Sequence, residues 1–75
     1  MREQIAKIIN SVRPEIKIMP GEDTELFGVL DSLDIIFIVD ELESQLFITI
    51  DADQIIPENF ASLSVLEAFV KSCIR

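Results

Sequence analysis

Ser32 is the side chain with the clearest chemical potential, because it stands where a helix is expected to begin. Asp31 is a good N-cap, and Asp34 three residues later completes a capping box with Asp in place of the usual Glu. With Asp31 as the cap, the Ser32 hydroxyl is free to face solvent. A helix N-terminus stabilises a phosphoryl group through its unpaired N–H groups and its dipole. Ser32 is therefore a candidate attachment site; the alternative is an ordinary serine at a helix start.

The rest of the sequence offers few groups for catalysis. It contains no histidine, and Cys73 is its only cysteine. This excludes Ser-His-Asp and Cys-His catalysis, a zinc site of the usual ligands and an internal disulfide. Asp51-x-Asp53 begins like a calcium loop, but Ile56 and Ser62 stand where the glycine and the closing glutamate belong. We therefore expect no metal site, and a chain that binds, carries or is bound rather than an enzyme.

The segment that follows Ser32 has two apolar sides when it is placed on a helical wheel. The side expected to face the core consists of Ile35, Ile38, Val39, Leu42 and Leu46. The opposite side carries Leu33, Ile36 and Phe37, which we call the apolar patch. Its rim is polar and consists of Asp34, Asp40, Glu41 and Ser44.

A helix in a chain this short cannot easily bury both of these sides. We therefore expect the apolar patch to be exposed, and an apolar surface with a charged rim is typical of a partner-binding site. The alternative is that the preceding loop folds over the patch and makes it part of the core, using Ile18, Leu26 and Phe27.

The hydrophobic pattern predicts an all-α chain with four helices. The first helix has apolar residues at i, i+3, i+4 and i+7 and ends before Pro14. A long irregular segment over 13–30 leads to the second helix, and either Ser62 or Ser64 could cap the last one. The elements expected in order are helices over 2–12 and 31–46, an extended stretch over 47–50, a short turn or helix around 53–55 and a final helix over 62–73. The whole chain, residues 1–75, is expected to form one domain.

Length and charge restrict the partners of this domain. The 75 residues include 6 Lys and Arg against 14 Asp and Glu, a net charge of −8. Such a polyanion is repelled by nucleic acid phosphates and by anionic lipid. No apolar run approaches the roughly 20 residues of a membrane span, and the first residues do not form a signal peptide. We expect a cytoplasmic monomer that does not bind nucleic acid or insert into a membrane.

The charges are also distributed unevenly. No Lys or Arg occurs between Ile18 and Val70, a stretch that contains twelve of the acidic residues. One interpretation is a solvated surface that favours solubility. The other is a docking surface for basic partners, whose encounter it would accelerate.

Asp31-Ser32-Leu33 at the start of the second helix resembles the motif of the acyl carrier protein family. The similarity extends over nearly the whole chain, with the same order of elements and the same acidic character. It includes Leu26-Phe27 in the long loop, Gly28-Val29-Leu30 before the motif, Ile48-Thr49-Ile50, and the run from Glu58 to Leu63. The tripeptide in this setting is a more specific signal than the tripeptide alone.

This resemblance implies a four-helix bundle of acyl-carrier type, with a long first loop and a short third helix. It implies that Ser32 receives a phosphopantetheine arm from coenzyme A, with Asp31 and Leu33 shaping the motif. The thiol of the arm would carry an acyl or aminoacyl group as a thioester. The second helix would be recognised by a phosphopantetheinyl transferase (a holo-carrier synthase) and by acyl- or aminoacyl-loading and acyl-processing enzymes, through Leu33, Asp34, Ile36, Phe37, Asp40 and Glu41.

The chain also departs from one branch of this family. Val29-Leu30 replaces the small residues that usually precede the motif in fatty-acid-type carriers, and Phe37 and Asp40 differ from that pattern too. The chain is more similar to D-alanyl carriers and other dedicated stand-alone carriers, which argues against housekeeping fatty acid synthesis. The alternative function is an unmodified acidic interaction module that binds a partner through the apolar patch.

A carrier also needs space for its cargo. We expect such space between the second and the last helix, with five apolar residues as candidates for its lining: Ile35, Val39, Leu42, Leu66 and Phe69. For each of these residues the alternative is an ordinary place in the core.

Overall fold

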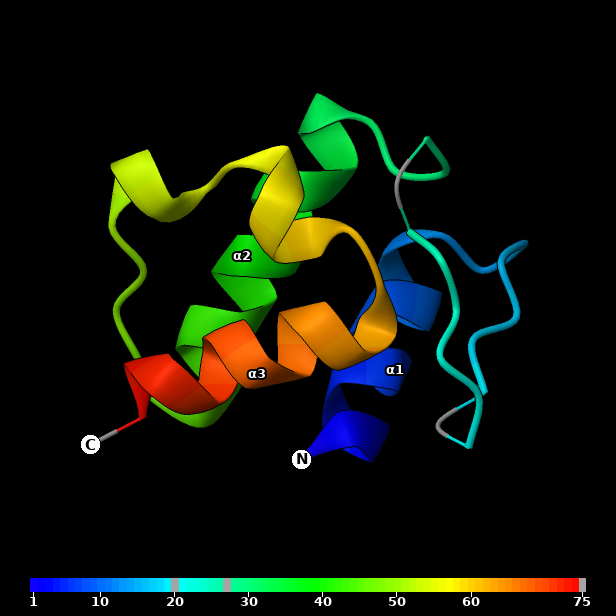
Figure 1. Ribbon diagram of the computed structural model, residues 1–75, viewed down its shortest axis with the longest axis horizontal. Coiled ribbons are helices and arrows are strands. Elements are labelled where there is room, and N and C mark those ends of the chain that lie inside the picture. The colour runs from blue at the N-terminus through cyan, green and yellow to red at the C-terminus, as the bar shows by residue number, and fades with distance from the viewer. Residues whose placement is uncertain (20, 27, 75) are drawn as a thin grey trace.

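Three α-helices and two short 3₁₀ turns make up the fold in a computed structural model, which describes residues 1–19, 21–26 and 28–74. The helices are α1 (Arg2–Val12), α2 (Ser32–Leu46) and α3 (Leu63–Cys73). The 3₁₀ turns η1 (Ala52–Gln54) and η2 (Pro57–Phe60) lie between α2 and α3 (Figure 1). The described residues form no strand, so the expected all-α class is confirmed.

The expected short third helix is not present as an α-helix. Its place is taken by η1 and η2, which are three and four residues long. Pro57 interrupts this segment because it has no N–H to donate, and a run of a few residues cannot repay the cost of nucleating an α-helix. The described chain is therefore a three-helix arrangement, and the prediction of a four-helix bundle is not confirmed.

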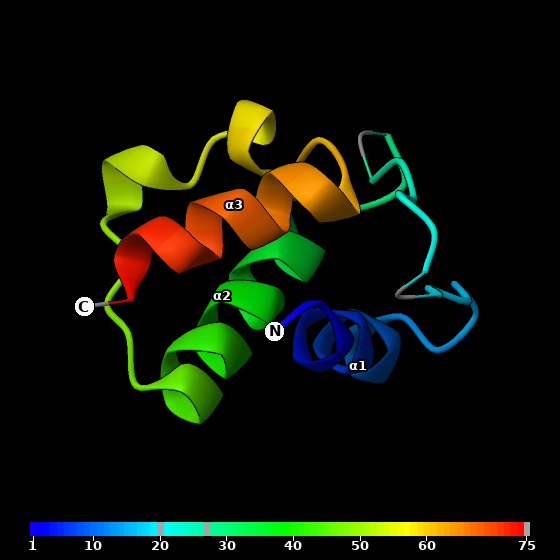
Figure 2. The ribbon, with the colours of Figure 1, turned by 60° about the horizontal axis from the view of Figure 1, so that its bottom comes forward.

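α1 is the helix that packs against both α2 and α3, and η2 packs against α3. Figure 2 shows α1 nearly end-on, beside α2 and below α3. The Cα trace has a radius of gyration of 11.0 Å and extends over 29 × 22 × 19 Å. None of the helices in the described ranges is long and apolar enough to cross a membrane.

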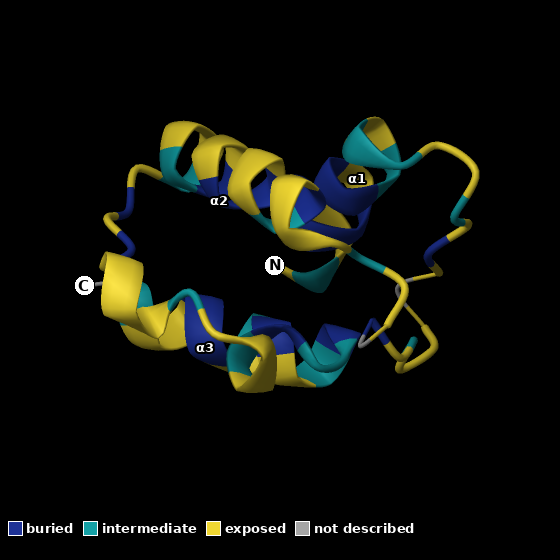
Figure 3. Cartoon of the chain, turned by 90° about the horizontal axis from the view of Figure 1, so that it is seen from above, coloured by how far each residue is buried: buried dark blue, intermediate teal, exposed yellow. Residues whose placement is uncertain are grey.

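α1 and α2 bury the side that their apolar spacing predicts, whereas α3 leaves Val65 of its expected apolar side exposed. α1 buries Ile5, Ile8 and Ile9, and α2 buries Ile38, Val39 and Leu42. Ile35 and Leu46, which we also expected in the core, are half-buried and pack against its edge. Figure 3 shows the exposed residues of α2 along its outer side and the buried ones toward the interior of the molecule.

The long loop between α1 and α2 is fixed to the rest of the fold at several places along its length. Asn10 holds Ile18, since its Oδ1 accepts the Ile18 N–H at 3.1 Å and its Nδ2 donates to the Ile18 carbonyl at 3.4 Å. Farther along, Glu25 and Ser62 form an isolated antiparallel bridge. Leu26 is almost fully buried beside this bridge, and its N–H donates to the Ala61 carbonyl at 2.8 Å.

The helix ends follow their capping residues. The predicted capping box of Asp31 and Asp34 is confirmed at the start of α2. Ser62 caps α3 by accepting the Val65 N–H, so Ser62 rather than Ser64 is the cap.

The extended stretch expected over 47–50 differs from its prediction at Phe47. This residue ends α2 in the left-handed conformation, with φ 55° and ψ 44°. After it the chain turns back, and Ile48 and Ile50 are buried. The sequence pattern misses the turn because glycine or asparagine normally marks a left-handed C-cap.

Candidate functional site

The first turn of α2 presents Ser32 to solvent. Two hydrogen bonds fix this turn: the Asp34 N–H donates to Asp31 Oδ1 at 2.9 Å, and the Asp31 N–H donates to Asp34 Oδ2 at 3.1 Å. Asp31 and Ser32 are both exposed. Ser32 is therefore exposed on a turn that the capping box holds, as its place after the N-cap predicts.

Asp34 has a role that the sequence pattern does not reveal. It is the only buried charged residue among the described ones, with 8% of its surface exposed. Besides its capping role it forms an ion pair with Arg13, whose guanidinium also pairs with Glu15. Asp34 thus faces inward and does not belong to the exposed rim of the apolar patch, where the helical wheel places it.

The environment of Asp34 keeps its carboxyl group ionised. Burial raises the pKa of Asp34, but the hydrogen bond from the Asp31 N–H and the interaction with the Arg13 guanidinium lower it by more. The net result is a pKa below the usual value of an aspartate. The capping box therefore keeps its full charge at neutral pH.

The apolar patch is exposed, as expected. The exposed fractions are 63% for Leu33, 52% for Ile36 and 55% for Phe37. Around it, Asp40, Glu41 and Ser44 are exposed and form the remaining rim.

The alternative, that the long loop covers this patch, fails for two of the three residues proposed for it. Ile18 and Leu26 belong to the core, and Phe27 lies outside the described residues. The patch therefore stays accessible on the outer side of α2, in continuity with the turn that carries Ser32.

A pocket of about 260 Å³ opens directly beside Ser32. The loop before α2, the first turns of α2 and η2 contribute its lining: Leu26, Gly28, Leu30, Asp31, Ser32, Ile35, Pro57 and Phe60. Gly28 has φ 81°, a left-handed conformation that suits glycine and turns the loop into this wall.

The location of this pocket corrects our expectation about space for cargo. Of the five candidate lining residues only Ile35 reaches the pocket. Val39, Leu42, Leu66 and Phe69 are buried in the core. The sequence does not reveal that Pro57 and Phe60 contribute to the pocket. The bridge between Glu25 and Ser62 brings η2 near the loop, and it joins segments that lie far apart in the chain.

A second pocket lies at the opposite end of α2. It has a volume of about 560 Å³ and is lined by Leu46–Thr49 and by Ser72, Cys73 and Ile74. A helix of 15 residues is about 22 Å long, so this pocket and Ser32 are separated by nearly the length of α2. The half-buried thiol of Cys73 thus belongs to a different part of the molecule from Ser32.

The acidic residues do not assemble into a metal site in the part of the chain that the structure describes, where no group of three or more potential ligands is suitably placed. The carboxylates of the Asp51–Asp53 segment, which begins like a calcium loop, are spread over η1 and its N-cap and are exposed.

Comparisons of the chain with family models, with curated proteins and with solved structures found no match. Function has to be inferred from the residues themselves. The features that the described chain brings together are an exposed serine on a capped helix turn, an apolar patch beside it and a small pocket at its base.

Proposed function

We propose that this protein is a carrier and not an enzyme, with a phosphopantetheine arm attached to Ser32. The observation that supports this function best is the exposure of Ser32 on a turn that is rigidly capped and lies beside an exposed apolar patch. When bound, the arm supplies a thiol that holds an acyl or aminoacyl group as a thioester. We also propose that the fold is of the acyl-carrier type that the sequence resembles.

The residues around Ser32 suit a phosphodiester at this position. The Asp31 side chain accepts the Asp34 N–H, whereas the N–H groups of Ser32 and Leu33 belong to the first turn and lack partners within the helix. These groups and the positive end of the helix dipole favour a negatively charged phosphate. In the attachment step Ser32 Oγ forms a bond to the phosphorus next to the pantetheine, and the pyrophosphate bond of coenzyme A breaks. The adenosine bisphosphate leaves, and a base of the transferase accepts the hydroxyl proton.

The pocket beside Ser32 favours a small cargo. Its volume of about 260 Å³ is below the roughly 300–1,000 Å³ of pockets that enclose drug-sized ligands. Its apolar walls, Leu26, Leu30, Ile35 and Phe60, could shelter a short acyl group close to the attachment point. This agrees with a dedicated carrier better than with a carrier of long fatty acyl chains.

The surface of α2 suits the partners that such a carrier needs. A phosphopantetheinyl transferase and loading and processing enzymes would contact Leu33, Ile36 and Phe37 and place basic residues near Asp40 and Glu41. The net charge of −8 makes a nucleic acid an unfavourable partner. The lone free cysteine is consistent with a reducing compartment, so we propose a cytoplasmic monomer.

A mass measurement tests the proposal. After incubation with coenzyme A and a broad-specificity phosphopantetheinyl transferase, we expect the intact mass to increase by one phosphopantetheinyl group. Ser32→Ala should abolish the increase, whereas Ser44→Ala, which removes another exposed serine of α2, should leave it unchanged. An unmodified wild type, or an equal increase in Ser32→Ala, would show that the carrier function is wrong.

The exposed apolar patch also favours a second candidate, an unmodified module that binds a partner protein. In that case Ser32 is an ordinary helix-start residue. The two functions differ in this experiment, because the module would show no mass increase in any variant.

A further inference from the structure

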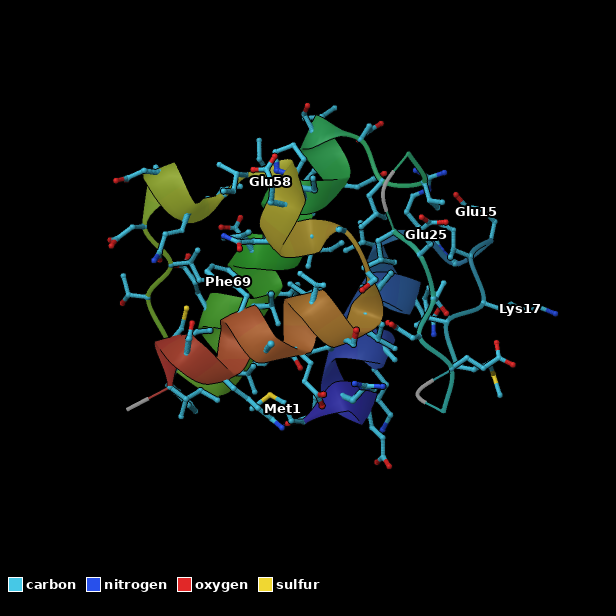
Figure 4. The ribbon with its side chains drawn as sticks, in the orientation of Figure 1. Met1, Glu15, Lys17, Glu25, Glu58 and Phe69 are labelled. Carbon is cyan, nitrogen blue, oxygen red and sulfur yellow. The ribbon has the colours of Figure 1, made fainter. Side chains whose placement is uncertain are left out.

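Arg13 connects the end of α1 to the turn that carries Ser32. Its backbone is fixed as the C-cap of α1, where its N–H donates to the Ile9 carbonyl at 2.8 Å. Its guanidinium reaches across to Asp34 in the first turn of α2 and also pairs with Glu15. Figure 4 shows Glu15 on the outer loop. The guanidinium therefore bonds both to this loop and to the start of α2. Arg13 thus joins three elements near the site.

The contact with Asp34 acts directly on the capping box. The oxygen that pairs with Arg13, Oδ2, is the same oxygen that accepts the Asp31 N–H. The position of this carboxylate determines the geometry of Asp31 and, through it, of the turn that presents Ser32. Removal of Arg13 would leave a buried carboxylate without its countercharge, which favours rotation of Asp34 toward water.

No other ion pair among the described residues reaches α2. The remaining two pairs join Arg2 to Glu67 and Arg13 to Glu15. The sequence explains this isolation, because α2 itself contains four acidic residues and no basic one. The countercharge for its first turn has to come from outside the helix.

We propose that Arg13 is a positioning residue for Ser32, holding the first turn of α2 through Asp34 in the geometry that a modifying enzyme must meet. The effect on modification rests on the proposed carrier function, but the effect on the turn does not. Arg13 does not touch the hydroxyl in this role, and its influence passes through the capping box.

The chain provides a closely matched control in Arg2. The side chains of Arg2 and Arg13 are both 31% exposed, and each pairs with a carboxylate that is at most 16% exposed, on another helix. Arg2 joins α1 to α3 through Glu67, away from Ser32. Arg2→Gln removes the ion pair with Glu67, and Arg13→Gln removes the pair with Asp34 together with the exposed pair with Glu15. Only the pair with Asp34 concerns the site.

The first measurement is amide hydrogen exchange of the purified variants without any enzyme. Loss of a capping interaction changes local opening by up to about tenfold, so Arg13→Gln should accelerate exchange at the Asp34 amide by about this factor relative to amides of α3. Arg2→Gln should leave this ratio unchanged, and Arg13→Lys should restore part of it. Equal ratios in Arg13→Gln and Arg2→Gln would overturn the proposal.

The second measurement is the rate of phosphopantetheine transfer to each variant. We expect Arg13→Gln to lower kcat about tenfold with little change in KM, because the apolar patch still docks while the hydroxyl is misplaced. Arg2→Gln should stay within about twofold of wild type. If the transfer rate falls in both variants, and in the same proportion to the decrease in melting temperature, Arg13 is merely structural. If the wild type is not modified at all, the carrier function fails, and the exchange ratios alone decide whether Arg13 holds the turn.

Discussion

Phe47 combines two unfavourable features at one position. It has a left-handed backbone conformation, which costs an L-residue roughly 1–2 kcal/mol, and its side chain is 93% exposed. Glycine normally occupies this place at the end of a helix. Nothing in the described contacts compensates for the choice of phenylalanine.

Phe47→Gly should therefore stabilise the protein, by about 0.5–1 kcal/mol after allowing for the greater freedom of glycine in the unfolded chain. The control is Phe37→Gly, the same substitution at an exposed phenylalanine with helical backbone, which should destabilise by roughly 0.5 kcal/mol or more. Urea unfolding of both variants measures the difference. A destabilised Phe47→Gly would mean that the ring makes contacts that outweigh its backbone conformation.

Single-residue features that depend on near neighbours were predictable from the sequence. The capping box of Asp31 and Asp34 and the exposure of Leu33, Ile36 and Phe37 follow from spacing along one helix. The burial of Asp34 was not predictable, because it depends on Arg13, which lies 21 residues away in the chain. Helical periodicity carries no information about such a distant partner.

One side chain of α1 holds the first part of the long loop before α2. Asn10 pairs with both backbone groups of Ile18, in the way that a neighbouring strand would. Asn10→Ala should lower the free energy of unfolding by about 1–2 kcal/mol, because two buried backbone groups lose their partners.

The same substitution should make the loop more susceptible to limited proteolysis between Pro14 and Thr24. Asn59→Ala is the control, since Asn59 donates one exposed hydrogen bond to the Gln54 carbonyl at 2.7 Å. It should change stability by at most about 0.5 kcal/mol. An equal loss in both variants would show that Asn10 does not anchor the loop.

The positions of the three α-helices were predictable from the sequence, whereas the structure of the segment between α2 and α3 was predictable only in part. Each helix carries its own apolar stripe, and α2 and α3 also carry a side-chain N-cap; these are local signals. Pro57 and the turn signal divide the residues over 51–60 into two short 3₁₀ turns, so the short turn or helix expected there is present as a turn and a third full helix is not confirmed. The pocket beside Ser32 could not be predicted, because its walls meet only after distant segments have paired.

At the scale of the whole molecule, two electrostatic effects of opposite direction control stability. A net charge of −8 destabilises the compact state by self-repulsion, and this repulsion decreases as the pH falls toward the pI of about 4.2. Against this, some carboxyl groups have a lowered pKa because hydrogen bonds and neighbouring cations stabilise their charge: Glu15, Asp23, Asp34 and Glu67. A lowered pKa in the folded state stabilises the protein above the unfolded pKa, near 4, and this stabilisation is lost as the pH falls through the folded value.

The melting temperature should therefore rise from pH 7 to about pH 5 and fall below about pH 4. Added salt or millimolar divalent cation at pH 7 should also raise it by screening the repulsion, and should have little effect near the pI. Thermal melts at low and high ionic strength across this pH range measure both effects. A melting temperature that falls steadily from pH 7, or that salt lowers at neutral pH, would contradict this account of the charges.

The single thiol of the chain makes the proposed modification countable. Cys73 lies on α3, next to the end of α2 that is farthest from Ser32. Titration with a thiol reagent in denaturant should give one equivalent per chain before treatment with coenzyme A and a transferase, and two afterwards. The stoichiometry of labelling thus reports the occupied fraction of carriers without a mass spectrometer, and in Cys73→Ser the arm would carry the only thiol that reacts.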